Sequence, residues 1–237
     1  MSTFESVAAV ATAATHAANP EPATDLPQLS HAGGISTIRL NRPGSSNWLR
    51  DQDLRWLLAT LAELHANPMV RVVVLTAQTG GQGRPVFCGG YEYIEAAKER
   101  YDPTLLDKVA RALEGLRPIT LCAMNGSCIG PALDLVLACD LRVAGAGAQL
   151  AMPLGMSGFN NRHTFVRAVK QLGMNGAKRL FLAGRPMGAE DPAVRGLFEA
   201  VPRPELFESY VGTLARQIAA MEPAALQIIK RKLTDAV

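Results

Sequence analysis

Apolar residues recur with helical spacing in two segments of the first half of the chain. One segment is Asp51–His65, where the repeat is Leu54, Leu57, Leu58, Leu61 and Leu64. The other is 103–116, where it is Leu105, Leu106, Val109 and Leu113. Residues three and four positions apart lie on the same face of a helix. The pattern therefore predicts two helices that each turn one apolar face to a core, and the first should end at Asn67-Pro68.

Short apolar runs before, between and after these helices predict strands. The run Val70–Thr76 is rich in β-branched residues and predicts a buried strand. Further strand-like runs lie at 35–40, 86–90, 119–124 and 141–144, and 119–124 also predicts a buried strand. Helical patterns dominate afterwards, near 164–172, 176–182, 191–197, 205–221 and 223–235. Strands that alternate with helices predict an α/β fold built of layers.

The start of the chain differs from the rest. Residues 1–30 are rich in alanine and proline, and the first basic side chain is Arg39. A secretory signal needs a positively charged beginning, so none is expected here. We expect residues 1–30 to form an arm and residues 31–237 to form one domain, which is long enough to bury a sizeable core.

Charge and cysteine content narrow the classes of function. The net charge of +3 at pH 7 and the lack of a basic run argue against nucleic-acid binding. A membrane span needs about 20 apolar residues in a row, and the sequence has no such stretch. The four cysteines show no spacing typical of a zinc site. We therefore expect reduced cysteines in the core, no metal and a cytoplasmic location.

The most informative stretch is Thr120–Asp140. It reads as a buried strand, a glycine turn and a helix that opens at Gly130-Pro131. The first N–H groups of a helix have no intrahelical partner and lie at its positive end, so they stabilise a developing negative charge. This stretch resembles the signature Ala-Val-x-Gly-x-x-x-Gly-Gly-Gly-x-Glu-Leu-x-x-x-Cys-Asp of the crotonase (enoyl-CoA hydratase/isomerase) superfamily.

Five further motifs follow the order and spacing of that superfamily. They are Ile38–Pro43 with Asn47, Val72–Thr76, Phe87–Gly90, Leu182–Arg185 with Gly196-Leu197, and Pro223–Lys230. The resemblance covers roughly residues 35–235. It implies a spiral of ββα units with C-terminal helices, a homotrimer or hexamer, and a substrate that is an acyl-CoA or carrier-bound thioester. It implies no cofactor beyond the coenzyme A that the substrate carries. The long helical tail that many members have after the residue matching Lys230 is missing, so we expect the cover of the site to differ.

The resemblance also implies a catalytic site with two N–H donors for a thioester oxygen and two carboxylates. The first donor would be the N–H of Tyr91, and the second would come from position 131, where Pro131 has no N–H. The first carboxylate aligns with Asp134, which is either the acid/base group or a buried structural aspartate. The second aligns with Leu154, which cannot transfer a proton, so hydration by two carboxylates is not expected.

Other residues complete the predicted site. His163 is an alternative general base, although a surface histidine at a helix start is the simpler interpretation. The loop from Arg42 to Asn47 is expected near coenzyme A, and Lys230 either meets phosphate or belongs to a solvated helix face. The predicted substrate pocket further includes Gly90, Tyr93, Gly130, Pro131 and Leu154.

Three functions fit these observations. The first is an enzyme of enolate-type chemistry, such as isomerisation or dehydration, with Asp134 as its acid/base group. The second is a specialised-pathway member, because the chain resembles the small crotonase-like proteins that assist aromatic polyketide thioester formation in the dihydroxyphenylglycine pathway. The third is a catalytically impaired accessory or binding subunit with a pathway-enzyme partner, which the pair Pro131 and Leu154 favours.

Overall fold

Two sheets built mainly of parallel strands form the frame of the fold. The computed structural model describes residues 25–80, 83–91, 104–152 and 162–235. The larger sheet has the strand order β1-β2-β3-β5-β7. Its strands are β1 (Gln28–Ala32), β2 (Ile35–Leu40), β3 (Val72–Ala77), β5 (Ile119–Met124) and β7 (Leu141–Ala144). Only β1 at the edge runs antiparallel to its neighbour.

The smaller sheet has the strand order β4-β6-β8-β9. Its strands are β4 (Val86–Cys88), β6 (Ser127–Ile129), β8 (Gln149–Ala151) and β9 (Met187–Gly188). The strands β4, β6 and β8 are parallel to one another, and β9 pairs antiparallel to β8. Parallel strands bring their carboxyl ends to one edge of a sheet, so the turns after β4 and β6 become neighbours.

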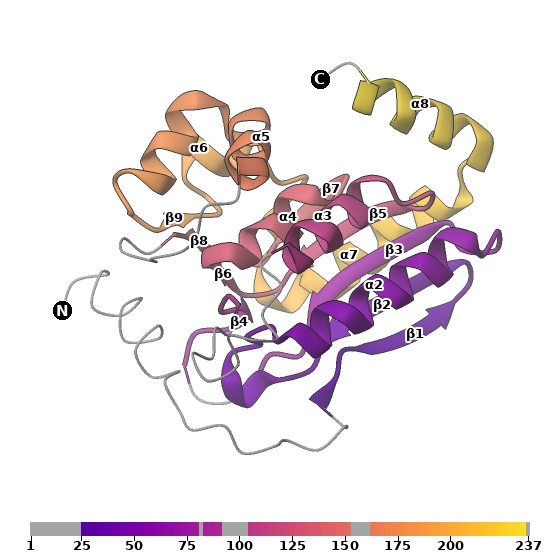
Figure 1. Ribbon diagram of the computed structural model, residues 1–237, viewed down its shortest axis with the longest axis horizontal. Helices are drawn as coiled ribbons and strands as arrows, with labels where there is room; N and C mark the ends of the chain where they lie inside the picture. The colour runs from indigo at the N-terminus through magenta and orange to yellow at the C-terminus, as the bar shows by residue number, and fades with distance from the viewer. Residues whose placement is uncertain (1–24, 81–82, 92–103, 153–161, 236–237) are drawn as a thin grey trace.

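The chain moves between the sheets in a repeated order. Each repeat places one strand in the larger sheet, the next in the smaller sheet, and then a helix. The helices are α3 (Leu105–Glu114) after β3 and β4, α4 (Leu133–Ala138) after β5 and β6, and α5 (Arg162–Phe181) after β7 and β8. This order confirms the predicted spiral of ββα units, and Figure 1 shows the repeats following one another.

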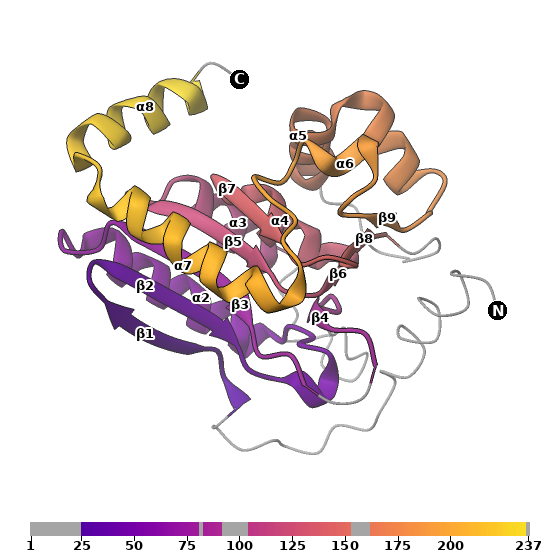
Figure 2. The same ribbon diagram turned by 180° about the vertical axis from the view of Figure 1, so that it is seen from behind.

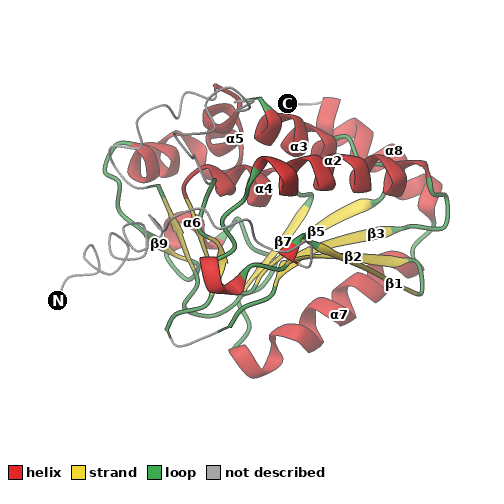
Figure 3. Ribbon diagram, turned by 60° about the horizontal axis from the view of Figure 1, so that its bottom comes forward, coloured by secondary structure: helices red, strands yellow, loops and turns green. Residues whose placement is uncertain are grey.

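Both faces of the larger sheet are covered, which explains its almost continuous apolar strands. On β3, Val73 and Leu75 belong to the main core together with the leucines of α2 (Asp51–Ala66). Val72 and Val74 alternate with them and belong to a second cluster with Phe207 and other residues of α7 (Pro204–Ala220). Figure 3 shows the sheet between α2 and α3 on one side and α7 on the other. The predicted buried strand and the two amphipathic helices are confirmed.

Two of the later helices, α6 (Pro192–Arg195) and α8 (Pro223–Asp235), lie at the periphery. α6 follows β9, and α8 extends away from the body of the fold, as both opposite views show (Figures 1 and 2). Within α5, Gly173 has a φ of 68°. The sequence predicted a break between helices at 164–172 and 176–182, and this left-handed glycine makes that break.

The structure adds strands that the sequence pattern did not predict. β6, β8 and β9 have three residues or fewer, which is too short for an alternating pattern to be visible. β1 begins at Gln28, inside the segment 1–30, and pairs Gln28 with Arg39.

The four cysteines are buried and free, as predicted. In the part of the chain that the structure describes, no helix is both long and apolar enough to cross a bilayer.

Candidate active site

A tight loop after β2 holds two of the predicted substrate-binding residues. Asn47 has a φ of 53°, a left-handed conformation that asparagine tolerates better than most residues. Its Oδ1 accepts from the Arg42 N–H at 2.9 Å, and its Nδ2 donates to the carbonyls of Gln78 and Val86 at 3.0 and 3.1 Å. Asn47 is only 2% exposed. It therefore ties the loop to the end of β3 and to β4.

The same loop is bonded to the glycine turn that follows β4. The Gly89 N–H donates to the Ser46 carbonyl at 2.8 Å, and the Leu49 N–H donates to the Gly90 carbonyl at 2.9 Å. Gly90 has a φ of 133°, which a residue with a side chain rarely adopts. A Cβ on Gly90 would lie 3.5 Å from the Ile129 carbonyl oxygen. The turn after β4 therefore contacts the end of β6, as the parallel pairing requires.

Tyr91 follows this turn. Its phenol donates to Oδ1 of Asp51, the first residue of α2. Tyr91 also forms a parallel bridge with Leu49. The side chain is buried between the turn and α2, so the position expected to supply a backbone N–H is fixed from two directions.

The turn after β6 meets Tyr91's turn from the neighbouring strand. It is a short 3₁₀ helix, η4 (Gly130–Ala132), that leads into α4. Gly130 has a φ of 62°, and Pro131 stands within the first two positions of the helix, where a missing N–H is tolerated. All three residues are buried. The turn thus has its predicted shape but lacks the N–H at position 131.

Asp134 lies in the first turn of α4 and is 0% exposed. Its Oδ2 accepts from the Thr164 hydroxyl at 2.6 Å, and its Oδ1 accepts from Nη1 of Arg167 at 3.3 Å. Burial raises the pKa of Asp134, while the bonds from Thr164 and Arg167 act in the opposite direction. The structure therefore places a buried carboxyl with a raised pKa directly after the Gly130 turn.

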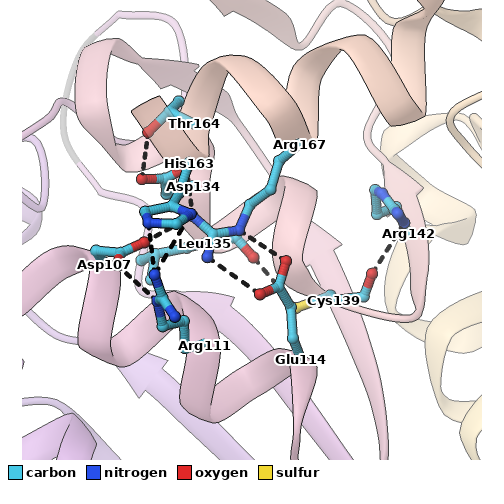
Figure 4. Close-up of polar contacts among 10 residues, drawn as sticks. All are labelled: Asp107, Arg111, Glu114, Asp134, Leu135, Cys139, Arg142, His163, Thr164 and Arg167. Atoms are coloured by element: carbon cyan, nitrogen blue, oxygen red, sulfur yellow. Dashed lines mark hydrogen bonds and ion pairs between the residues drawn. The ribbon is translucent and has the colours of Figure 1, made fainter. Parts of the chain in front are cut away.

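Arg167 joins three acidic side chains from two other helices (Figure 4). It donates from Nε and Nη2 to the two carboxylate oxygens of Glu114 at 2.7 and 3.0 Å, and from Nη1 to Asp107 at 3.2 Å. The Arg167 side chain is 6% exposed. Although burial opposes it, hydrogen bonding to Glu114 and the nearby acidic groups raise the pKa of Arg167, so it stays charged. We call Asp107, Glu114, Asp134 and Arg167 the acidic–arginine cluster.

Comparison with known proteins identifies the relatives of this chain. The family model described as Enoyl-CoA hydratase/isomerase matches residues 30–237. The chain belongs to the enoyl-CoA hydratase/isomerase family. The Bacillus subtilis protein named "Putative enoyl-CoA hydratase/isomerase YngF" is 32% identical over 202 residues that cover 83% of this chain and 76% of YngF.

Solved structures agree with this family assignment. The Pseudomonas aeruginosa protein PA4980 superposes with a TM-score of 0.80 at 29% identity, covering 91% of this chain and 94% of that one. A monofunctional enoyl-CoA isomerase from M. smegmatis superposes with a TM-score of 0.75 at 25% identity, covering 90% and 93%. The crotonase resemblance and the fold it implies are therefore confirmed.

The structure places the site residues that the family motifs predict. Gly90 and Tyr91 follow β4, and Gly130 and Pro131 follow β6, the parallel strand beside it. The two turns come close where Gly90 lies against the Ile129 carbonyl, and Asp134 follows on the adjoining helix. His163 is exposed and lies against Arg111, whose guanidinium can only donate, so a ring nitrogen of His163 accepts (Figure 4). Tyr93 and Leu154 lie outside the described residues.

Lys230 is far from these turns. Its Nζ bonds to Asp140 at 2.7 Å and to the Pro118 carbonyl at 3.2 Å. Asp140 in turn accepts from the N–H and hydroxyl of Thr120 at the start of β5. The six residues of β5 alone span about 20 Å toward its carboxyl end. The structure therefore gives Lys230 a fixed place at the opposite end of β5 from the two turns.

Three residues of the site escaped the sequence analysis. Thr164 and Arg167 stand in a segment predicted to be helical, and nothing in their spacing indicates that they contact Asp134 across thirty residues or more. Trp48 stands directly after Asn47 in a recognised family motif, which was the only available signal.

Among the described residues, no group of three or more histidine, cysteine or acidic side chains has an arrangement suited to a metal ion.

Proposed function

We propose that this chain binds an acyl-CoA or carrier-bound acyl thioester and moves a proton at the carbon next to the thioester carbonyl. The observation that carries the proposal is Asp134, a buried carboxyl with a raised pKa that directly follows the Gly130 turn. A buried carboxyl with a raised pKa beside a substrate turn is suited to general acid–base work near neutral pH. The family and the name of the superposing isomerase support the same class of chemistry.

Each residue has a role in this proposal. The N–H of Tyr91 donates to the thioester oxygen and stabilises the charge that develops there. Asp134 takes a proton from one carbon and returns it to another, which is an isomerisation with one carboxyl group. Addition of water calls for a second group to activate the water, and Leu154 cannot supply it. His163 is the weaker candidate for a base because it is exposed beside Arg111.

Exchange of substrate hydrogen with solvent tests the proposal without knowledge of the final product. Butyryl-CoA is incubated with the protein in D₂O, and loss of the α-proton signal is followed by NMR. The proposal predicts exchange that is faster than in buffer and proportional to protein concentration. Exchange at the buffer rate with butyryl-CoA, acetoacetyl-CoA and 3-enoyl-CoA would contradict it.

A second candidate function is an accessory subunit with the same fold but impaired catalysis. It is favoured by the proline at position 131 and by the fact that both oxygens of Asp134 accept hydrogen bonds within the protein. Such a subunit would bind a thioester or a pathway-enzyme partner without turnover. A homotrimeric or hexameric assembly remains a prediction for either function.

Restoring the family residues tests whether the pocket keeps the geometry that hydration needs. The double variant Pro131→Gly with Leu154→Glu restores an N–H and a second carboxylate. If the site retains its substrate geometry, the double variant should gain hydration of crotonyl-CoA by at least about 100-fold over the parent chain, which is the usual contribution of one oxyanion donor. The single variant Leu154→Gln is the matched control and should gain nothing. No gain in the double variant would show that the pocket itself has diverged.

A further inference from the structure

The indole ring of Trp48 lies directly against the glycine turn after β4. A Cβ on Gly89 would lie 2.5 Å from Nε1 and 2.7 Å from Cδ1 of Trp48. A Cβ on Gly90 would lie 3.4 Å from Cζ3 of the same ring. Glycine is therefore needed at position 89 to leave room for the ring. The ring extends along the turn from Gly89 to Gly90.

The indole nitrogen has an unmet hydrogen bond. Nε1 of Trp48 is buried, and no acceptor for it exists among the described residues. Indole N–H groups that are buried normally find a partner, because leaving a donor unpaired away from water costs free energy. The turn beside this donor carries residues of the predicted site. A ligand oxygen bound there could supply the acceptor that the indole N–H lacks.

The backbone of Trp48 is held in place by hydrogen bonds on both sides of the residue. The Trp48 N–H donates to the Ser45 carbonyl at 3.0 Å, and the Trp48 carbonyl accepts from Nη1 of Arg42 at 2.8 Å. The neighbours Asn47 and Leu49 are bonded to β4 and to Gly90. The backbone that carries the indole ring is therefore fixed before any ligand arrives, which reduces the entropy lost on binding.

The same region lacks a donor elsewhere. Pro131 has no N–H, and the carbonyl of Ile129, two residues before it, lies 3.5 Å from a Cβ on Gly90. Gly90 thus has the Trp48 ring on one side and the end of β6 on the other. The Trp48 N–H lies in the loop before α2, and the N–H missing at Pro131 belongs to the turn after β6. Both segments contact Gly90.

We propose that the Trp48 indole N–H donates a hydrogen bond to a carbonyl oxygen of the acyl-thioester ligand and compensates in part for the N–H absent at Pro131. This inference rests on the proposed function, because it takes the ligand class from it. The acceptor is either the thioester oxygen or an amide oxygen of the pantetheine arm, which share the same carbonyl chemistry.

The test removes the N–H while keeping the ring. Trp48 is replaced by β-(3-benzothienyl)alanine, in which sulfur stands in place of the N–H, and Trp48→Phe is made alongside it. The control is Trp56→Phe, because Trp56 lies on α2 and packs against the core. This substitution leaves Trp48 as the only tryptophan of the chain. Binding of acetyl-CoA and of S-ethyl-CoA, which lacks the thioester oxygen, is measured by calorimetry and by Trp48 fluorescence in the control.

The benzothienyl variant should bind acetyl-CoA about 5- to 10-fold more weakly than the control, the usual size of one hydrogen bond. Unchanged affinity for S-ethyl-CoA would assign the acceptor to the thioester oxygen, and an equal loss would assign it to an amide oxygen. Acetyl-CoA affinity equal to that of the control would overturn the inference alone. If the unmodified protein binds neither ligand, the proposed function on coenzyme A thioesters fails and this inference fails with it.

Discussion

Replacement of Arg167 by methionine is expected to lower the free energy of unfolding by about 3 to 5 kcal/mol. Arg167 forms an ion pair with Asp134, and it also pairs with Glu114 and Asp107. Asp134 is fully buried, so the variant would remove this ion-pair partner from a carboxyl in the core. The penalty for the unpaired group exceeds the value of the ion pair itself.

Thermal unfolding followed by circular dichroism measures this effect. For a chain of this size, a loss of about 4 kcal/mol corresponds to a fall of about 10 °C in Tm. Arg179→Met is the matched control, because Arg179 pairs with Asp191 at the surface and should cost less than about 1 kcal/mol. The double variant Arg167→Met with Asp134→Asn should recover part of the loss. Equal losses for Arg167→Met and Arg179→Met would contradict the role given to the cluster.

Replacement of Asp134 by asparagine should reduce thioester α-proton exchange by about 100-fold or more, the usual contribution of a general base. The amide keeps an oxygen for Arg167, and its NH₂ group donates to the Thr164 hydroxyl, so the fold is retained. Exchange is measured by NMR in D₂O and the fold by Tm. Asp191→Asn is the control, because this carboxyl caps α6 and contacts Arg179 instead of the turns. Unchanged exchange in Asp134→Asn would leave Asp134 a structural role only.

The pH dependence gives a second readout for Asp134. Burial raises the pKa of this carboxyl in the folded state. Its contribution to stability is therefore fully present below the ordinary pKa of aspartate, about 3.9, and is lost as the pH rises through the raised value. Exchange needs the ionised form, so its acid limb should lie above the ordinary aspartate pKa. Asp134→Asn should remove that pH dependence of stability.

The sequence alone was enough to predict the helices and strands whose apolar residues repeat over many positions. The leucine repeat of α2 and the valine run of β3 lie where the pattern placed them, because burial of one helix face or of a whole strand leaves a repeat of many residues. β6 and β9 are too short to carry a period. Their existence depends on pairing with strands distant in sequence, which a local pattern does not contain.

The candidate site was predictable only in part for the same reason. Family motifs located Gly90, Pro131 and Asp134, because these residues stand within contiguous signatures. The partners of Asp134 are on α5, and Trp48 reaches the turn after β4 from the loop before α2. These contacts form only when segments distant in sequence pack against one another in the folded spiral. The sequence therefore indicated the candidate residues, while the structure supplied the side chains that contact them.

Calorimetric titration with acetyl-CoA and acetoacetyl-CoA tests the central claim most directly, since every role proposed for Asp134, Tyr91 and Trp48 requires a bound thioester. The account predicts saturable binding in the micromolar range, equivalent to about −8 kcal/mol. Absence of binding up to millimolar ligand would contradict the claim of a coenzyme A thioester site in this chain.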